Sequence, residues 1–148
     1  MIVCKQFTFH AAHRLDHHEG QCKDLHGHSY KLEIAVKGPR KQWVSGYPAP
    51  DEGMVVDFDL LKEFYKSEIE PDFEHKYLNE SVAPQMAAMG CFRVKPGYQV
   101  QTTAENLARY VWQVLHSYLG SDALADKFEG VEVAFIRLWE TPTSYVEV

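Results

Sequence analysis

Residues 26–37, HGHSYKLEIAVK, show the clearest periodicity in the 148-residue sequence. Even-numbered positions carry histidine, tyrosine and aliphatic side chains, whereas odd-numbered positions carry glycine, serine, alanine and charged side chains. Successive side chains of a β-strand point to opposite faces, so this strict alternation predicts a half-buried strand. The imidazoles of His26 and His28 are two residues apart and are therefore expected to project from the same face.

A preceding strand is predicted over residues 2–12, and a polar loop over 14–25 joins the two strands. If the strands pair as an antiparallel hairpin, the end of the first meets the start of the second, and His13 then lies beside His26 and His28. Neutral imidazoles bind zinc, and a catalytic zinc site takes three protein ligands and keeps a fourth position open. We therefore predict a zinc site at these three histidines, although an isolated His-x-His pair is more often structural.

The rest of the sequence contains patterns for two helices and three further strands. In chain order we expect a turn region at 38–53, a short strand at 54–56, a helix at 58–69 capped by Asp57, an irregular segment at 71–79, a long loop at 80–101, a helix from the capping box Thr102-x-x-Glu105 to about Leu119, and strands at 130–139 and 143–148. Because helices and strands are segregated along the chain, we expect an α+β fold in which two helices cover one face of a small antiparallel sheet.

The composition limits the class of protein. The length fits one domain, which we expect to span residues 1–148, and 45% hydrophobic with 24% charged residues is ordinary for a soluble globular protein. A net charge of −6 without a basic cluster argues against a nucleic-acid partner, and no apolar run approaches the roughly 20 residues that span a membrane. Cys4, Cys22 and Cys91 form no CxxC pair and no secretion signal is evident, so we expect a cytoplasmic location.

Three further positions carry groups that could act in catalysis. Cys22 lies four residues before His26, where it could serve as a base or nucleophile, fill space, or complete a closed zinc site as a fourth ligand. Glu74 and His75 could form an acid–base dyad if the chain turns there. Glu140 ends an apolar strand and could bind an NH/NH₂ edge through both carboxylate oxygens, or could simply be an exposed strand end.

Four other histidines and two cationic residues carry less specific signals. We assign no role to His10, His17, His18 and His116. Arg14 and Lys23 flank the 14–25 loop and are candidate partners for a phosphate group.

Several runs in chain order resemble the 6-pyruvoyl-tetrahydropterin synthase superfamily, and more closely its bacterial branch, the 6-carboxytetrahydropterin synthases of queuosine biosynthesis. The runs are FHAAHRL (9–15), Cys22-x-x-x-His26-Gly-His28, VVDF (55–58), FEHKYLN (73–79), TTAEN (102–106) and WET (139–141). The resemblance implies a tunnelling fold (T-fold), in which a four-stranded antiparallel sheet carries two helices. It also implies trimers whose sheets close a barrel, two such trimers stacked as a hexamer, and active sites between subunits.

The resemblance also implies roles for individual residues. The zinc ligands of the family fall on His13, His26 and His28, and its proton-abstracting cysteine falls on Cys22. The relay histidine falls on His75, with Glu74 where the family usually has aspartate. The pterin-anchoring glutamate falls on Glu140, and Thr103 is expected to help hold the pterin.

The activity implied by the resemblance is a zinc-dependent lyase reaction. Its substrate is 7,8-dihydroneopterin triphosphate, and its products are 6-carboxy-5,6,7,8-tetrahydropterin, acetaldehyde and triphosphate. The C-x₃-HGH spacing is similar to that of the carboxy-type enzymes. Two alternatives stay open: synthesis of 6-pyruvoyltetrahydropterin on the same fold, and a non-catalytic zinc-binding module closed by Cys22. The 80–101 segment is longer than the bacterial type leads us to expect.

Overall fold

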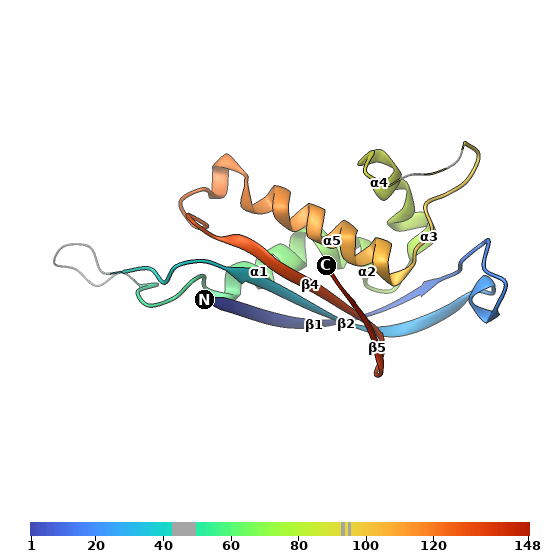
Figure 1. Ribbon diagram of the computed structural model, residues 1–148, viewed down its shortest axis with the longest axis horizontal. Helices are drawn as coiled ribbons and strands as arrows, with labels where there is room; N and C mark the ends of the chain where they lie inside the picture. The colour runs from blue at the N-terminus through green and yellow to red at the C-terminus, as the bar shows by residue number, and fades with distance from the viewer. Residues whose placement is uncertain (43–49, 93, 95) are drawn as a thin grey trace.

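A computed structural model describes residues 1–42, 50–92, 94 and 96–148. Part of the expected 38–53 turn region therefore lies outside the described residues. Figure 1 shows a long twisted sheet with the helices gathered on one side of it. None of the described helices combines the length and the apolar character needed to cross a membrane.

The sheet has five strands in the order β3-β1-β2-β4-β5. The strands are β1 (Ile2–His13), β2 (His26–Lys37), β3 (Lys76–Tyr77), β4 (Glu132–Thr141) and β5 (Ser144–Glu147). The pairs β1–β2, β2–β4 and β4–β5 are antiparallel, which confirms the four strands expected for the fold. The two-residue strand β3 adds a short parallel pairing to the edge of β1.

The β1–β2 pairing fixes the end of the sheet where the histidines lie. It runs in unbroken register from Ile2 opposite Lys37 to His13 opposite His26. Since side chains alternate along each strand, the odd residues of β1 share a face with the even residues of β2. This face is the buried one, because Phe9, Tyr30 and Leu32 are all fully buried.

Residues 54–56 do not form the expected strand. Val55 and Val56 are both buried, with 2% and 4% of their surface exposed, and they lie in a bend. Neighbouring residues of a half-buried strand point to opposite faces, so burial of both side chains is incompatible with that strand. Asp57 then begins α1 (Phe58–Phe64) as expected, since its side chain accepts a hydrogen bond from the Asp59 N–H at 2.8 Å.

The first helical segment extends beyond its expected end at residue 69. A π-helical turn η2 (Tyr65–Ile69) follows α1, and α2 (Glu70–Phe73) follows that turn. Pro71 closely follows this π-helical turn, and because proline has no N–H it removes one hydrogen bond from the continuous helical run. The segment expected to be irregular at 71–79 therefore contains the end of α2 and the strand β3.

The prediction of a long loop at 80–101 was wrong for the first part of that segment. It contains the end of α3 (Leu78–Ser81) and all of α4 (Ala83–Ala88). The apolar residues Leu78, Val82 and Met86 recur every four positions and are fully buried, which is helical periodicity. Pro84, which suggests a loop in the sequence, lies in the first turn of α4, where proline is favourable.

The main helix, α5 (Ala104–Leu119), begins one residue later than expected. Its N-cap is Thr103, whose hydroxyl accepts from the Asn106 N–H at 3.3 Å, and not Thr102. Gly120 ends the helix as expected. The buried stripe of α5 packs on the sheet beside β4, and two single 3₁₀ turns, η1 (Gln21–Lys23) and η3 (Asp122–Leu124), complete the described elements.

The opposite face of the sheet is polar. Its centre is Glu33, 5% exposed, which accepts hydrogen bonds from Gln6 at 3.0 Å, Arg137 at 2.8 Å and Trp139 at 3.3 Å. A buried carboxylate is tolerated when several donors satisfy it. The sheet therefore separates an apolar helix-covered side from a polar side that the described helices do not cover.

Candidate metal centre and active site

The three predicted histidines converge at the open end of the β1–β2 pair. One ring nitrogen from each of His13, His26 and His28 lies within 4.8 Å of the others. The ring centroids are 4.6 Å apart for His13 and His26, 5.2 Å for His13 and His28, and 4.8 Å for His26 and His28. This cluster is a candidate site for a metal ion.

Backbone carbonyls decide which nitrogen of two of these rings carries the proton. His13 Nδ1 lies 2.8 Å from the Thr102 carbonyl, and His26 Nδ1 lies 2.8 Å from the Asp24 carbonyl. A carbonyl oxygen only accepts hydrogen bonds, so each Nδ1 must be the donor and each Nε2 carries a lone pair in the neutral ring. Yet the two Nε2 atoms face each other at 3.1 Å. Two facing lone pairs are favourable only with a cation between them, so the cluster fits a metal ion.

The third ring supports the same interpretation. His28 Nε2 is buried and has no hydrogen-bond partner among the described residues. Burial lowers the pKa of His28 and that of His13, and this effect outweighs the nearby Glu140 carboxylate, which acts in the opposite direction. Metal binding requires the neutral imidazole, which these lowered pKa values favour.

Glu140 reaches the cluster from β4. Its Oε1 lies 3.6 Å from His13 Nε2 and 4.0 Å from His28 Nε2. The carboxylate is 30% exposed, so it borders both the histidines and the solvent. It therefore faces a ligand that approaches the cluster from outside.

A cavity of about 430 Å³ brings together three of the predicted catalytic and substrate-binding residues. Cys22, Thr103 and Glu140 all line it, together with Leu15, His18, Ala104, Glu105, Ser144, Tyr145 and Val146. The turn that carries Cys22 is fixed by a hydrogen bond from the Leu15 N–H to the Cys22 carbonyl at 2.8 Å. Cys22 is not part of the histidine cluster in the described structure, which disfavours the closed site with a sulfur ligand.

Asn79, which the sequence alone did not indicate as functional, holds the cluster in place. Asn79 is 3% exposed, and its carboxamide pairs with both backbone groups of Arg14, the residue after His13. Its Oδ1 also accepts from the Thr102 hydroxyl at 3.2 Å, and the Thr102 carbonyl in turn binds His13 Nδ1. Asparagine is mostly exposed in proteins, so its residue type did not predict a buried role. The signal available in the sequence was its position at the end of the run FEHKYLN.

We expect Asn79→Ala to destabilise the fold by about 2–4 kcal/mol, because it removes a buried side chain and leaves the N–H and C=O of Arg14 and the buried Thr102 hydroxyl without their partner. The free energy of unfolding from urea titration measures this effect. The exposed neighbour Glu80 provides a control, since Glu80→Ala is expected to change stability by less than about 0.5 kcal/mol. Equal stabilities of the two variants would contradict the role given to Asn79.

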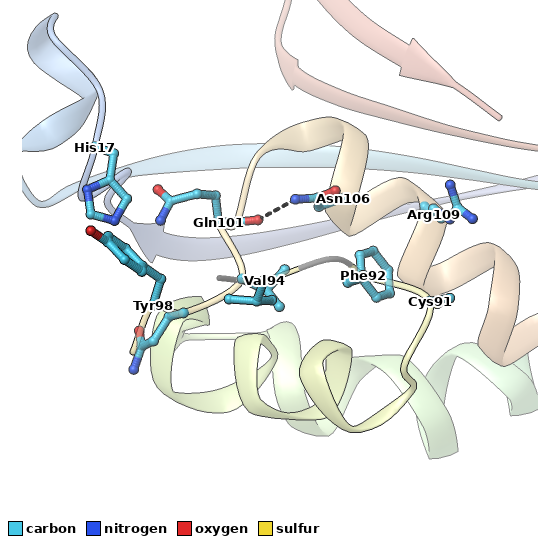
Figure 2. Close-up of a pocket in the computed structure, with 10 residues that line it drawn as sticks. His17, Cys91, Phe92, Val94, Tyr98, Gln101, Asn106 and Arg109 are labelled. Atoms are coloured by element: carbon cyan, nitrogen blue, oxygen red, sulfur yellow. Dashed lines mark hydrogen bonds between the residues drawn. The ribbon is translucent and has the colours of Figure 1, made fainter. Parts of the chain in front are cut away.

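A larger cavity, of about 930 Å³, lies beside the first turns of α5 (Figure 2). His17, Tyr98 and Arg109 line it, and the Asn106 side chain donates to the Gln101 carbonyl at 2.8 Å. None of the described residues that line it belongs to the histidine cluster.

The comparisons with known proteins agree with the site geometry. The sequence profile of the family described as 6-pyruvoyl tetrahydropterin synthase matches residues 2–148. The chain belongs to this family. A protein of Haemophilus influenzae named 6-carboxy-5,6,7,8-tetrahydropterin synthase is 33% identical over 98% of this chain and 96% of its own length. A Rickettsia felis protein of the same name is 32% identical over the full length of both chains.

Solved structures confirm the expected T-fold. The 6-pyruvoyl tetrahydropterin synthase of Caenorhabditis elegans superposes with a TM-score of 0.68 at 22% identity, over all of this chain and 94% of that one. At this identity the likeness concerns the fold alone. Together with the sequence relatives it makes this chain an enzyme of the tetrahydropterin synthase family.

In this family member, the Glu74–His75 pair forms but lies away from the Cys22 cavity. His75 Nε2 is 2.9 Å from Glu74 Oε1, and the His75 side chain is 78% exposed. Both residues are held against His10, an even-numbered residue of β1 on the face opposite His13. Neither Glu74 nor His75 lines the cavity with Cys22 in the described structure.

The remaining sequence candidates have local contacts. Arg14 Nε pairs with Asp16 at 2.7 Å, and Lys23 lies in η1. His17 packs against Tyr98, His18 Nδ1 accepts from the Gly20 N–H, and His116 stacks on Trp112. Neither Arg14 nor Lys23 lines the Cys22 cavity in the part of the chain that the structure describes.

The lowered pKa values predict how metal-free protein responds to acid. Burial lowers the pKa of His13 and His28 in the folded state, so below the unfolded value of about 6.5 the unfolded chain binds more protons. The free energy of unfolding is therefore expected to fall as the pH drops from 7 toward 5. Urea titrations in the presence of a chelator measure this decline, and His13→Gln is expected to reduce it. An identical decline in wild type and His13→Gln would contradict the prediction.

Proposed function

We propose that this protein is a zinc-dependent lyase that converts 7,8-dihydroneopterin triphosphate to 6-carboxy-5,6,7,8-tetrahydropterin with loss of acetaldehyde and triphosphate, as in queuosine biosynthesis. The observation that carries the proposal is the convergence of three imidazole Nε2 atoms beside Glu140 and a cavity lined by Cys22. Relatives that match nearly the whole chain are named 6-carboxy-5,6,7,8-tetrahydropterin synthase, which supports the choice of product.

The three histidines would hold the ion. When bound, zinc supplies a Lewis acid that polarises the side-chain oxygens of the substrate. His13 and His26 are oriented for this role by their Nδ1 bonds to backbone carbonyls, a common way to fix a ligand tautomer. The burial of His13 and His28 keeps both rings neutral and ready to coordinate.

Cys22, as a thiolate, would remove a proton from the substrate side chain, since it lines the cavity that Glu140 also borders. Glu140 would bind the NH/NH₂ edge of the pterin with its two oxygens and fix the ring relative to the histidines. Thr103 lines the same cavity at the start of α5, where its side chain caps the helix. These three residues therefore border one space large enough for part of the substrate.

The location of Glu74 and His75 bears on the assembly. In one chain they lie on the sheet face opposite the histidine cluster, so they do not border the cavity with Cys22. We propose that they complete the site of a neighbouring copy in a trimer or a dimer of trimers. The polar sheet face around Glu33 would then line the interior of the barrel.

The domain and cellular assignments form part of the same proposal. Residues 1–148 would act as a single pterin-synthase domain in the cytoplasm, with a small-molecule substrate. Synthesis of 6-pyruvoyltetrahydropterin is the second candidate, because a Dictyostelium discoideum protein named 6-pyruvoyl tetrahydrobiopterin synthase is 28% identical over 78% of this chain.

The products of the zinc-loaded protein distinguish these reactions. Incubation with 7,8-dihydroneopterin triphosphate is expected to release acetaldehyde and to yield a product with the mass of 6-carboxytetrahydropterin. A product of pyruvoyltetrahydropterin mass without acetaldehyde would support the second candidate. No turnover at all, with zinc bound and the protein folded, would contradict both.

A further inference from the structure

His10 received no role in the sequence analysis, yet it contacts both members of the Glu74–His75 dyad. It is exposed on β1 and lies three residues before His13, so its side chain projects from the opposite face of the sheet. The cavity on this side, of about 530 Å³, is lined by His10, Ser29 and His75 together with Ala11, Ala12, Gly27, His28, Lys76 and Tyr77.

Two hydrogen bonds join the backbone of His10 to the dyad. The His75 N–H donates to the His10 carbonyl at 2.7 Å, and the His10 N–H donates to Glu74 Oε2 at 3.1 Å. The other carboxylate oxygen, Oε1, lies 2.9 Å from His75 Nε2. Both oxygens of Glu74 are thus occupied, one by the backbone of β1 and one by the imidazole that it orients.

The backbone of His75 is held in an unfavourable conformation. Its φ of 55° lies in the left-handed region, where a residue with a Cβ is strained by about 1 kcal/mol. The bond to His10 and the β1–β3 pairing that begins at Ala11 and Lys76 maintain this turn. Because the turn points the His75 side chain outward, the ring is mostly exposed and needs a lateral support.

The His10 ring provides that support. It stacks against the His75 ring with centroids 5.9 Å apart and planes inclined by 26°. Its Nδ1 lies 3.0 Å from the hydroxyl of Ser29, the residue directly opposite on β2. Ser29 therefore fixes the rotation of the His10 ring, and the His10 ring limits the rotation of His75.

We infer that His10, held by Ser29, is a positioning residue that orients the Glu74–His75 dyad for proton transfer. This inference rests on the proposed function, in which His75 relays a proton. With Nε2–H of His75 donating to Glu74, the lone pair on Nδ1 is the site that accepts a proton, and Glu74 stabilises the imidazolium that forms. Of the described residues that line this cavity, Lys76 carries a positive charge, and His10 itself exchanges no proton with the substrate.

Substitutions at His10 test this inference on the zinc-loaded protein. His10→Ala is expected to lower kcat about tenfold with KM changed less than about twofold, since a displaced proton-transfer group slows the reaction without weakening binding. His10→Phe, which keeps a flat ring but loses the bond to Ser29, is expected to recover part of that loss. The matched control is Thr8→Ala, an exposed residue two positions earlier on the same face of β1, with unchanged kcat.

A double-mutant cycle separates positioning from a general structural effect. If His10 acts through His75, His10→Ala is expected to cause no further loss in a His75→Ala background. Losses that multiply in the double variant, or a His10→Ala kcat equal to that of wild type, would overturn the inference.

A second readout is independent of turnover. In proton NMR spectra, the His75 ring signals are expected to shift in His10→Ala, because the ring current of His10 is removed, and unchanged signals would overturn the inference. An inactive wild-type protein would refute the proposed function instead, and the NMR comparison would still show whether His10 orients the dyad.

Discussion

Replacing Cys22 by alanine is expected to lower kcat by about a thousandfold, because it removes the group that takes the proton from the substrate. Cys22 lines the same cavity as Glu140 and Thr103, so its thiol borders the space in which the substrate side chain would lie. Production of 6-carboxytetrahydropterin under saturating substrate measures the loss. Serine at this position, a much weaker acid than cysteine, is expected to restore little of the activity.

The chain offers a matched control at Cys4. This cysteine is an exposed residue of β1, but partial desolvation of its sulfur, together with the nearby Glu33 carboxylate, raises the pKa of the Cys4 thiol, so it forms less thiolate than an ordinary cysteine. Cys4→Ala is expected to keep the wild-type kcat. The zinc content of Cys22→Ala is equally informative, because a large loss of zinc would identify Cys22 as a ligand and support the non-catalytic alternative. A Cys22→Ala kcat close to that of wild type would refute the assignment of the base.

The four strands β1, β2, β4 and β5 and the histidine cluster follow from local pattern. Alternation over residues 26–37 fixes which side chains share a face, and one assumption, that this strand pairs with its predecessor, is enough to bring His13 to His26 and His28. Residue type and position indicated Cys22 and Glu140 as candidates, and the family resemblance added Thr103 and gave each a role. The structure places these three around one cavity. Their catalytic roles stay predictions.

Contacts between distant segments were beyond local pattern. Asn79 and Arg14 are 65 residues apart in sequence, and nothing in either segment indicates that they pair. The capping box placed the start of α5 one residue early because Thr102 is as good a cap as Thr103 in sequence. The difference arises in the tertiary structure, where the Thr102 hydroxyl is buried against Asn79 and is not available to the helix.

Two of the errors in secondary structure have related causes. At 54–56 and at 80–101, buried apolar side chains were interpreted without knowledge of what covers them. Val55 and Val56 are buried in a bend, and Met86 contributes to the core from a short helix that begins beside a proline. The position of Glu74 and His75 on the far side of the sheet from Cys22 was equally hidden, since a linear motif does not tell which face its residues occupy.

Replacing His26 by alanine is expected to weaken zinc binding by more than about a hundredfold and to reduce turnover correspondingly, since loss of a direct ligand costs more than loss of its supporting hydrogen bond. His26 is the best of the three ligands for this test. It is only partly buried, whereas His13 is 1% exposed and its replacement would leave a cavity in the fold. Titration with zinc in competition with a chelator measures the affinity, and unfolding curves of metal-free protein establish that the variant is folded.

The control for His26 is His18, an exposed histidine of the preceding loop whose Nδ1 accepts a backbone hydrogen bond. His18→Ala is expected to keep wild-type zinc affinity. Because the facing Nε2 atoms of His13 and His26 lose their repulsion when one ring is removed, metal-free His26→Ala is also expected to unfold at a urea concentration no lower than metal-free wild type. Unchanged zinc affinity in His26→Ala would refute the metal site, and with it the mechanism. A stable metal-free variant that no longer binds zinc would show that the cluster is arranged for the ion and not for the fold.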